Sequence, residues 1–349
     1  MNIGLREATL NFELKNNIGA EGKNSDVFIA HDKQFDADIV IKRIPKSDFN
    51  SPNDYYKEAK CLYTSKHQNI VTVNYSCEDD DHIYIAMPHY GKGSLESLSK
   101  TRFLTVREIL KYSIDFLSGL NHIHTKGLIH FDIKPTNILI SDSNEALVTD
   151  FGLAKFTNIH KVAEQDKFYS LHTAPECLVT NQFTIQVDIY HAGLTLYRIC
   201  NGSNVFKNQL AGITSKAELD SLITLGRFPD RDFFLPHIPQ KLRNVIRKAL
   251  SVNPADRYNN LIELLNELSK IQENLDWQLS AIPNGNKWLL DEDNKTYDIS
   301  LINDNGSFNI ETYKTMKGSG IRTRVNGDFR TNLTIQKATT ELKKILKSY

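Results

Sequence analysis

The chain has 349 residues, 40% of them hydrophobic and 24% charged, so it can bury a full core, and its length favours about two domains. Its 42 basic and 42 acidic residues balance, which argues against nucleic acid or another polyanion as the main partner of the whole chain. The four cysteines show no C-x-x-C spacing, which predicts free thiols. The N-terminus is polar, and no apolar run approaches the length of a membrane helix (about 18 residues). We therefore expect a cytoplasmic protein without membrane contact.

Short apolar and polar runs alternate from Leu10 to Pro88, which is typical of strands, whereas residues 53–67 have helical spacing. We therefore expect a sheet with one helix in this part. From about Leu104 the apolar period becomes 3.6 residues, which predicts a long helix. Further helices are expected over residues 185–200, 217–224, 241–250 and 259–272. A mainly β half is thus predicted to precede a mainly helical half.

One segment near the junction of the two halves carries a recognisable chemistry. His130-Phe-Asp-Ile-Lys-Pro-Thr-Asn137 is followed by Asp150-Phe-Gly152, and both stretches lie between apolar runs that predict strands. An aspartate can take the proton from an attacking hydroxyl, and a lysine two residues later can neutralise phosphate charge. An asparagine and a second aspartate can hold Mg²⁺ together. Asp132, Lys134, Asn137 and Asp150 have the types and spacing that these roles require.

The same segment resembles the catalytic and metal-binding loops of eukaryotic-type (Hanks-type) serine/threonine protein kinases, which also occur in bacteria and viruses. Their usual pattern is H-R-D-L-K-x-x-N followed by D-F-G. The resemblance implies an α+β, two-lobed fold over residues 1–275, with a β-rich N-lobe at about 10–88 and a helical C-lobe at about 91–275. Phe131 stands where the family usually has arginine. A switch that depends on phosphate binding to that arginine is therefore not expected.

The nucleotide site is predicted from Lys42, which ends the apolar run Ile39-Val-Ile-Lys42. A buried ammonium group needs a partner, and Glu58 on the predicted helix is the candidate. By resemblance, Lys42 would hold the α and β phosphates of ATP, Glu58 would orient Lys42, and Asn137 and Asp150 would hold Mg²⁺. The other residues that the resemblance places around the nucleotide are Ile18, Gly19, Ala20, Gly22, Ser25 and Val27 of the glycine loop, Val40, the hinge residues Met87, His89 and Tyr90, and Leu139.

The substrate side carries further marks of the family. Thr173-Ala-Pro-Glu176 resembles the A-P-E that ends the activation segment, with Arg257 as the expected partner of Glu176. Asp188 matches the aspartate that braces the catalytic loop. Small-molecule kinases generally lack this pattern, and Lys134 is the choice of serine/threonine kinases. The resemblance thus implies transfer of the γ-phosphoryl group of ATP to protein serine or threonine hydroxyls, with Asp132 as base and with possible autophosphorylation.

After residue 275 the composition changes, and turn signals such as Asn284-Gly285 separate candidate strands. Strands are expected over residues 277–282, 287–290, 296–302, 308–316 and 321–325, with a helix over 333–346. This pattern predicts a small C-terminal α+β domain over residues 276–349.

Two alternatives remain open at this point. The irregular glycine loop and the altered stretch before A-P-E would suit a pseudokinase that serves as a nucleotide-binding scaffold, although the five key polar residues are retained. Alternatively, the C-terminal domain is the functional centre, as a sensor or targeting module that binds a regulator. Its basic residues are Lys314, Lys317, Arg322, Arg324 and Arg330, and they would suit an acidic partner or nucleic acid.

Overall fold

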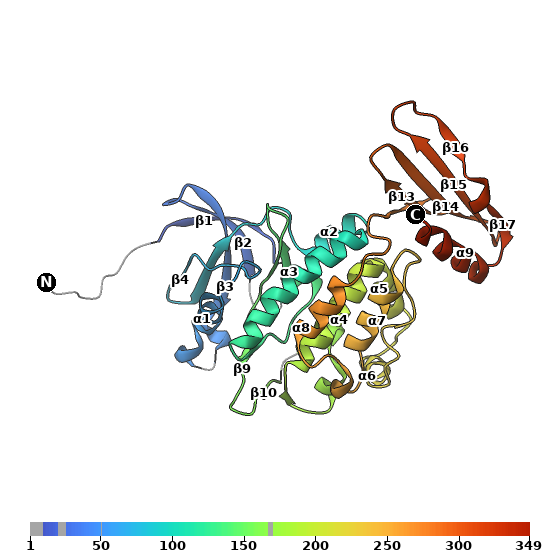
Figure 1. Cartoon of the computed structure of the whole chain (residues 1–349). Helices are drawn as coiled ribbons and strands as arrows, with labels where there is room; N and C mark the ends of the chain where they lie inside the picture. The colour runs from blue at the N-terminus through green and yellow to red at the C-terminus, as the bar shows by residue number, and fades with distance from the viewer. Residues whose placement is uncertain (1–9, 20–25, 50, 167–169) are drawn as a thin grey trace.

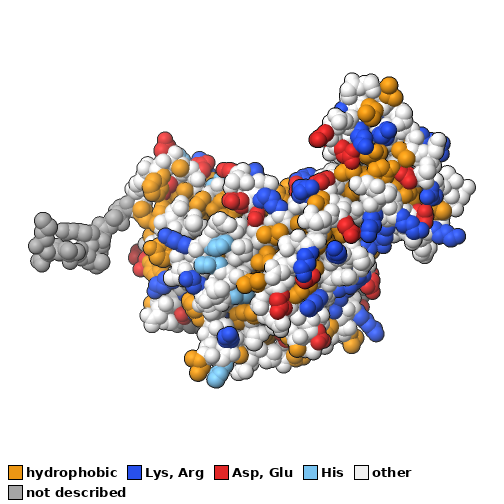
Figure 2. Space-filling model, viewed as in Figure 1, with side chains coloured by type: hydrophobic (Ala, Val, Ile, Leu, Met, Phe, Trp, Pro, Cys, Tyr) orange, Lys and Arg blue, Asp and Glu red, His pale blue; other side chains and the backbone are white. Residues whose placement is uncertain are grey.

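The computed structural model describes residues 10–19, 26–49, 51–166 and 170–349. Figure 1 shows two lobes that meet side by side and a third unit, formed by the C-terminal residues, against the helical lobe. Acidic and basic side chains are interspersed over the face seen in Figure 2, as the balanced composition predicts. No helix of the described residues has both the length and the apolar character that a membrane span requires. The cytoplasmic location stays a prediction.

The N-lobe is a sheet of antiparallel strands with one helix beside it (Figure 1). In the described residues the strand order is β1-β2-β3-β5-β4. Its elements are β1 (Phe12–Asn17), β2 (Asp26–Asp32), β3 (Ala37–Pro45), β4 (Tyr75–Glu78), β5 (His82–Pro88) and α1 (Lys57–Thr64). The helix predicted over residues 53–67 is therefore shorter than expected, because Pro52 begins a separate 3₁₀ turn, Pro52–Asp54, before it.

The C-lobe is built around two buried helices, α3 (Val106–Thr125) and α4 (Gln186–Asn201). Helix α3 begins at a capping box in which Thr105 and Glu108 satisfy each other's backbone amides. The remaining helices are α2 (Leu95–Thr101), α5 (Ser203–Leu210), α6 (Lys216–Thr224), α7 (Gln240–Ala249) and α8 (Leu261–Ser269). Helices α4, α6, α7 and α8 confirm the predicted ranges to within a few residues, whereas α2 and α5 were not predicted.

Three short antiparallel strand pairs lie where the C-lobe faces the N-lobe and along the following segment. They are β6 (Leu128–Ile129) with β9 (Lys155–Phe156), β7 (Ile138–Ile140) with β8 (Ala146–Val148), and β10 (Ala163–Glu164) with β11 (Gln182–Phe183). The first two pairs flank the segment 130–137 and the residues 150–152, and so hold both on short loops.

The C-terminal residues form an antiparallel sheet in the order β12-β13-β14-β15-β16, with β17 also paired to β15. The elements are β12 (Gln278–Ile282), β13 (Gly285–Asp291), β14 (Lys295–Asp304), β15 (Ser307–Met316), β16 (Arg322–Arg324), β17 (Arg330–Leu333) and α9 (Ile335–Lys347). Asn305 and Gly306, both with positive φ, join β14 to β15 in a two-residue turn. Strand β17 was not predicted, and β16 is shorter than the predicted 321–325.

One face of this sheet packs on α9 and forms an apolar core of its own, which Phe103 and Leu235 of the C-lobe join. Polar contacts also tie the two parts together. The Trp288 indole donates to Nδ1 of His237 (3.1 Å), and the Gln278 amide donates to the carbonyl of Phe103 (2.8 Å). The Asn274 amide donates to the carbonyl of His237 (3.0 Å). The sheet is therefore docked on the C-lobe by a mixed apolar and polar contact.

Candidate active site

The backbone of the loop that begins at His130 is held by the buried carboxylate of Asp188. Asp188 on α4 is fully buried and accepts from the backbone amides of His130 (2.8 Å) and Phe131 (2.9 Å) and from the ring of His124 (2.8 Å). Burial alone would raise the pKa of Asp188, but these hydrogen bonds and the His124 ring lower it. The brace predicted for Asp188 is present, and His124 is a further member that the sequence did not suggest.

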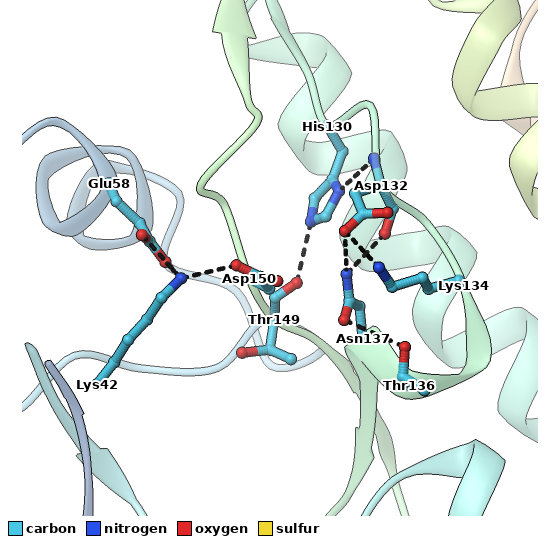
Figure 3. Close-up of polar contacts among 9 residues, drawn as sticks. All are labelled: Lys42, Glu58, His130, Asp132, Lys134, Thr136, Asn137, Thr149 and Asp150. Atoms are coloured by element: carbon cyan, nitrogen blue, oxygen red, sulfur yellow. Dashed lines mark hydrogen bonds and ion pairs between the residues drawn. The ribbon is translucent and has the colours of Figure 1, made fainter. Parts of the chain in front are cut away.

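The two carboxylate oxygens of Asp132 differ in their hydrogen bonds: Oδ2 accepts two, and Oδ1 accepts none from the described residues. Oδ2 accepts from Lys134 Nζ (2.8 Å) and from the side-chain amide of Asn137 (2.8 Å), which also donates to the backbone carbonyl of Asp132 (2.9 Å; Figure 3). Oδ1 is buried and has no hydrogen-bond partner among the described residues. Burial raises the pKa of Asp132, while the Lys134 ammonium opposes this shift. A positioned carboxylate with an open acceptor atom can take a hydrogen bond, and then a proton, from an incoming hydroxyl.

Lys42 on β3 lies between two carboxylates. Its Nζ donates to both Glu58 oxygens on α1 (2.8 and 3.0 Å) and to Asp150 Oδ1 (2.8 Å; Figure 3). Burial would lower the pKa of Lys42, but the charges of Asp150 and Glu58 raise it, so this ammonium stays charged. The Lys42 ammonium in turn lowers the pKa of Asp150 to about 2. The expected contact between Lys42 and Glu58 is thus present.

Asp150 is the more open of the two carboxylates. Its side chain is 41% exposed, against 11% for Glu58. Asp150 has a φ of 64°, an uncommon value for a residue other than glycine, and Phe151 after it packs edge-on against the His130 ring (4.9 Å between centroids). A Cβ on Gly152 would stand at ordinary van der Waals distance (3.4–3.6 Å) from the polar groups of Asp150, Glu58 and Lys42, so Gly152 adjoins all three. The Asp150 carboxylate is thus partly accessible to solvent while its Oδ1 atom contacts Lys42.

An apolar cluster lies beside these polar groups. Val40, Tyr90 and Leu139 are partly buried and pack against a core that contains Met87. The structure therefore brings these four predicted nucleotide-site residues together. The same core contains Leu147, which the sequence did not single out although it faces Leu139 across the β7–β8 pair. His89 is exposed at the end of β5.

Only the flanks of the predicted glycine loop are described. The Ile18 amide donates to the carbonyl of Val27 (2.7 Å), so the two strands close together at the base of the hairpin. A Cβ on Gly19 would lie 2.7 Å from the Val27 amide nitrogen, which means that this position requires glycine. Ala20, Gly22 and Ser25 lie outside the described residues.

The donor groups suit a magnesium nucleotide. Mg²⁺ prefers oxygen ligands, and the open carboxylate of Asp150 and the Oδ1 atom of Asn137 are of this kind. The Asn137 amide nitrogen donates to Asp132, so its Oδ1 atom is the end available to a metal; among the described residues Oδ1 accepts only a long hydrogen bond from the Thr136 hydroxyl (3.4 Å). The apolar cluster around Met87 can receive a flat base, and Lys42 can neutralise phosphate charge. The residues present therefore fit ATP with Mg²⁺.

Comparison with known proteins agrees with this geometry. Residues 12–268 match the family model described as a protein kinase domain, which is well over half of the chain. The chain belongs to the protein kinase family. The two-lobed fold expected from the sequence is thereby confirmed.

Among curated proteins, the kinase is 28% identical to serine/threonine-protein kinase PknD of Chlamydia trachomatis in an alignment of 311 positions that covers 77% of this chain and 32% of PknD. It is 29% identical to serine/threonine-protein kinase PrkC of Bacillus subtilis, over 68% of this chain and 37% of PrkC. A probable serine/threonine-protein kinase PknB of Lactococcus lactis is 26% identical, over 71% of this chain and 40% of the relative. The kinase thus spans between about a third and two fifths of the length of these relatives.

The segment that follows residues 150–152 is held in place at its end, Thr173-Ala-Pro-Glu176, by an ion pair. Arg257 makes two hydrogen bonds to Glu176 (2.6 and 2.7 Å), so the pair expected from the sequence is present. Phe131, at the position of the usual arginine, is buried with φ 64° and packs edge-on against Phe183 of β11 (5.7 Å between centroids). An apolar contact therefore replaces the cation at this position in the kinase.

A second set of polar contacts in the kinase was not predicted from the sequence. Arg198 on α4 donates to Glu96 on α2 (2.7 Å) and contacts the buried ring of His172 (2.7 Å), just before Thr173-Ala-Pro-Glu176. These residues are too far apart in the chain for spacing to suggest the contact. They connect α2, α4 and the activation segment.

Proposed function

We propose that this kinase transfers the γ-phosphoryl group of ATP to serine or threonine hydroxyls of proteins. The observation that carries the proposal is the buried Oδ1 of Asp132, which has no hydrogen-bond partner in the part of the chain that the structure describes, beside an Oδ2 atom held by Lys134 and Asn137. Such a carboxylate is fixed in orientation and has one acceptor available for a substrate hydroxyl. Because burial raises its pKa, Asp132 is also a better proton acceptor than an exposed aspartate.

The other polar residues position and neutralise the phosphates. Lys42 would contact the α and β phosphates, and Glu58 keeps the Lys42 ammonium in place through its two hydrogen bonds. Lys134 lies on the Asp132 carboxylate, where it can neutralise charge on the transferred group. Asn137 and Asp150 would hold Mg²⁺, which when bound neutralises phosphate charge and orients the γ-phosphoryl group. Val40, Met87, His89, Tyr90 and Leu139 would surround adenine, together with the glycine loop.

The choice of protein hydroxyls rests on two supports. The relatives are named serine/threonine-protein kinases, and this chain keeps the lysine two residues after the catalytic aspartate that is typical of that group. The end of the activation segment is anchored by the Glu176–Arg257 pair, and an anchored segment of this kind would suit the binding of a peptide substrate. Autophosphorylation is part of the same proposal.

We further propose that residues 1–275 form the kinase domain, with lobes at about 10–88 and 91–275, and that residues 276–349 form a second, α+β domain. The separate apolar core between α9 and the sheet supports this division. Its docking on the C-lobe through Trp288 and Gln278 suits a module that binds a regulator or target of the kinase.

The test is a phosphotransfer assay with labelled ATP, Mg²⁺ and casein as a general acceptor, together with phosphoamino-acid analysis. Asp132→Asn should reduce the rate at least about a hundredfold while ATP binding stays within a few-fold of the unchanged chain. Asp142→Asn, an exposed aspartate ten residues further along, is the matched control and should keep full activity. Full transfer by the Asp132 variant, or no transfer by the unchanged chain, would refute the proposal, and the latter result would favour a nucleotide-binding scaffold.

A further inference from the structure

The C-terminal sheet has a second face that α9 does not cover. Ile299 of β14 and Ile310 of β15 point into the core under α9, so the residues that alternate with them point the other way. Asp298 pairs with Tyr313 across β14 and β15, and Tyr313 pairs with Arg324 of β16. We call this the outer face; its charged and aromatic residues are Lys287, Asp298, Glu311, Tyr313, Arg322, Arg324 and Phe329.

Two arginines of the outer face lie over two aromatic rings. The Arg322 guanidinium carbon is 3.7 Å from the centre of the Tyr313 ring, and that of Arg324 is 3.5 Å from the centre of the Phe329 ring. The two rings pack edge to face, with 5.4 Å between their centroids. Both guanidinium groups are therefore held by neighbouring aromatic rings on the same face of the sheet. Stacking of this kind reduces the entropy that an arginine loses when it binds a ligand.

The positive charge of this pair is only partly compensated. Asp298 accepts from Arg322 (2.8 Å) and lies 3.5 Å from Lys287, so one carboxylate is shared between two cations. Arg324 has no ion pair or hydrogen bond through its guanidinium with any residue that the structure describes. Glu311 is on the same face, opposite Ser300, and forms no ion pair with a described residue. The guanidinium group of Arg324 is thus exposed, held in position by Phe329 and available to a ligand.

Strand β16 also has an open backbone edge, because it is the last strand of the sheet. The amide of Met316 donates to the carbonyl of Ile321, and the amide of Val325 donates to that of Thr312. In an antiparallel pair these bonds alternate, so the backbone groups of Arg322 and Arg324 point away from β15. The same two residues therefore offer an oriented guanidinium pair and a strand edge to which an extended segment can pair.

The covered rings decide which ligand fits. Single-stranded nucleic acid is usually held by bases stacked on exposed aromatic faces, but the guanidinium groups of Arg322 and Arg324 occupy one face of each ring, and the rings pack on each other. A compact anion does not need those faces. The planar fork of arginine matches a phosphate group in a two-point contact, and an added strand supplies the backbone contacts.

We propose that the outer face binds a phosphorylated serine or threonine within an extended segment that pairs with β16. The phosphate is held by Arg324 and by the free edge of Arg322. This inference rests on the proposed function, since phosphoserine and phosphothreonine are the products of this kinase. The C-terminal sheet would thereby hold a phosphorylated substrate, or a phosphorylated second copy of the chain, next to the enzyme that made it.

The test measures binding without ATP, so that it does not depend on catalysis. The full chain carries Asp132→Asn, which keeps its own products from filling the site. The probe is a fluorescent peptide mixture with a fixed central phosphoserine and degenerate flanks, and its unphosphorylated counterpart is the comparison. We expect the phosphorylated mixture to bind at least about tenfold more tightly. Added Arg324→Gln should remove that preference, and Arg324→Lys should keep only part of it, because lysine lacks the fork.

Arg227→Gln is the matched control, since it removes an exposed arginine from the C-lobe and should leave the preference unchanged. An unchanged melting temperature of each Arg324 variant shows that the sheet is intact. Equal binding of both peptide mixtures, or a preference that survives Arg324→Gln, would overturn the inference. So would tighter binding of oligothymidylate than of the phosphopeptides, or displacement of the peptides by micromolar inorganic phosphate. Failure of phosphotransfer in the assay above would leave this measurement unaffected and would instead refute the proposed activity.

Discussion

The ion pair between Glu176 and Arg257 allows a sharp prediction about stability. The Arg257 side chain is completely buried, and its N–H groups donate to both oxygens of Glu176 and to the carbonyls of Gln186, Ser251 and Val252. The three carbonyls are neutral, so Glu176 alone compensates the buried charge through direct hydrogen bonds. Changing Glu176 to glutamine keeps the size of the side chain but leaves the guanidinium without a counter-charge.

Removing one partner of a buried ion pair costs about 3 to 5 kcal/mol, because the other charge stays desolvated. We therefore expect Glu176→Gln to lower the free energy of unfolding by that amount. Urea unfolding at neutral pH, followed by circular dichroism, measures the loss. Glu267→Gln is the matched control, since Glu267 pairs with Lys270 at a similar distance (2.6 Å) but on the surface. This second change should cost less than about 1 kcal/mol.

The comparison isolates burial, because the two substitutions are chemically the same. If Glu176→Gln lowers the free energy of unfolding by no more than Glu267→Gln does, the pair is not the anchor described here. A double variant in which Arg257 and Glu176 are both replaced by methionine should recover part of the loss, because it removes the uncompensated charge.

Two further predictions concern buried groups. Phe131→Arg should lower stability by about 3 kcal/mol or more, because it places a cation where Phe131 packs against Phe183. Its melting temperature should fall and its activity should drop whether or not phosphatase is added; a gain of phosphatase sensitivity would contradict this. Burial lowers the pKa of His237 to about 3, so its ring is neutral in the folded chain, where it accepts from Trp288. The unfolded chain takes up a proton below about pH 6.5, and stability should therefore fall by about 2 kcal/mol per such histidine between pH 7 and pH 5. His237→Gln should flatten that dependence in part, since burial also lowers the pKa of His191, and an unchanged slope would refute the assignment.

The catalytic loop could be predicted from the sequence because its chemistry is local. Asp132, Lys134 and Asn137 fall within six residues, and the hydrogen bonds between them follow from that spacing. Lys42 and Glu58 are 16 residues apart, and their contact was predicted because a buried ammonium group needs a carboxylate. In these cases a short-range pattern or a strong energetic requirement was enough.

Other features depend on packing between distant segments. Arg198 meets Glu96 across 102 residues and His172 across 26, and nothing in the spacing indicates either contact. Helix α2 was missed because its sequence, Leu95–Thr101, has few apolar residues to mark a buried face. The open Oδ1 of Asp132 could not have been predicted either, because a free acceptor is defined by the geometry of all its neighbours.

The contact between the C-terminal sheet and the C-lobe has a consequence for how related chains diverge. The amides of Gln278 and Asn274 end on the main-chain carbonyls of Phe103 and His237, which any amino acid at those positions would supply. The bond from Trp288 needs a particular side chain, the neutral ring of His237, and the Arg107 guanidinium of the C-lobe donates to both carboxylate oxygens of Asp276 (2.5 and 2.7 Å). On the C-lobe side, the side chains of Arg107 and His237 and the apolar side chains of Phe103 and Leu235 are therefore constrained, whereas the two carbonyl contacts are not. A histidine and a tryptophan at the positions of His237 and Trp288, together with an arginine and an aspartate at those of Arg107 and Asp276, are thus a signature for finding other kinases that carry the same sheet in the same orientation.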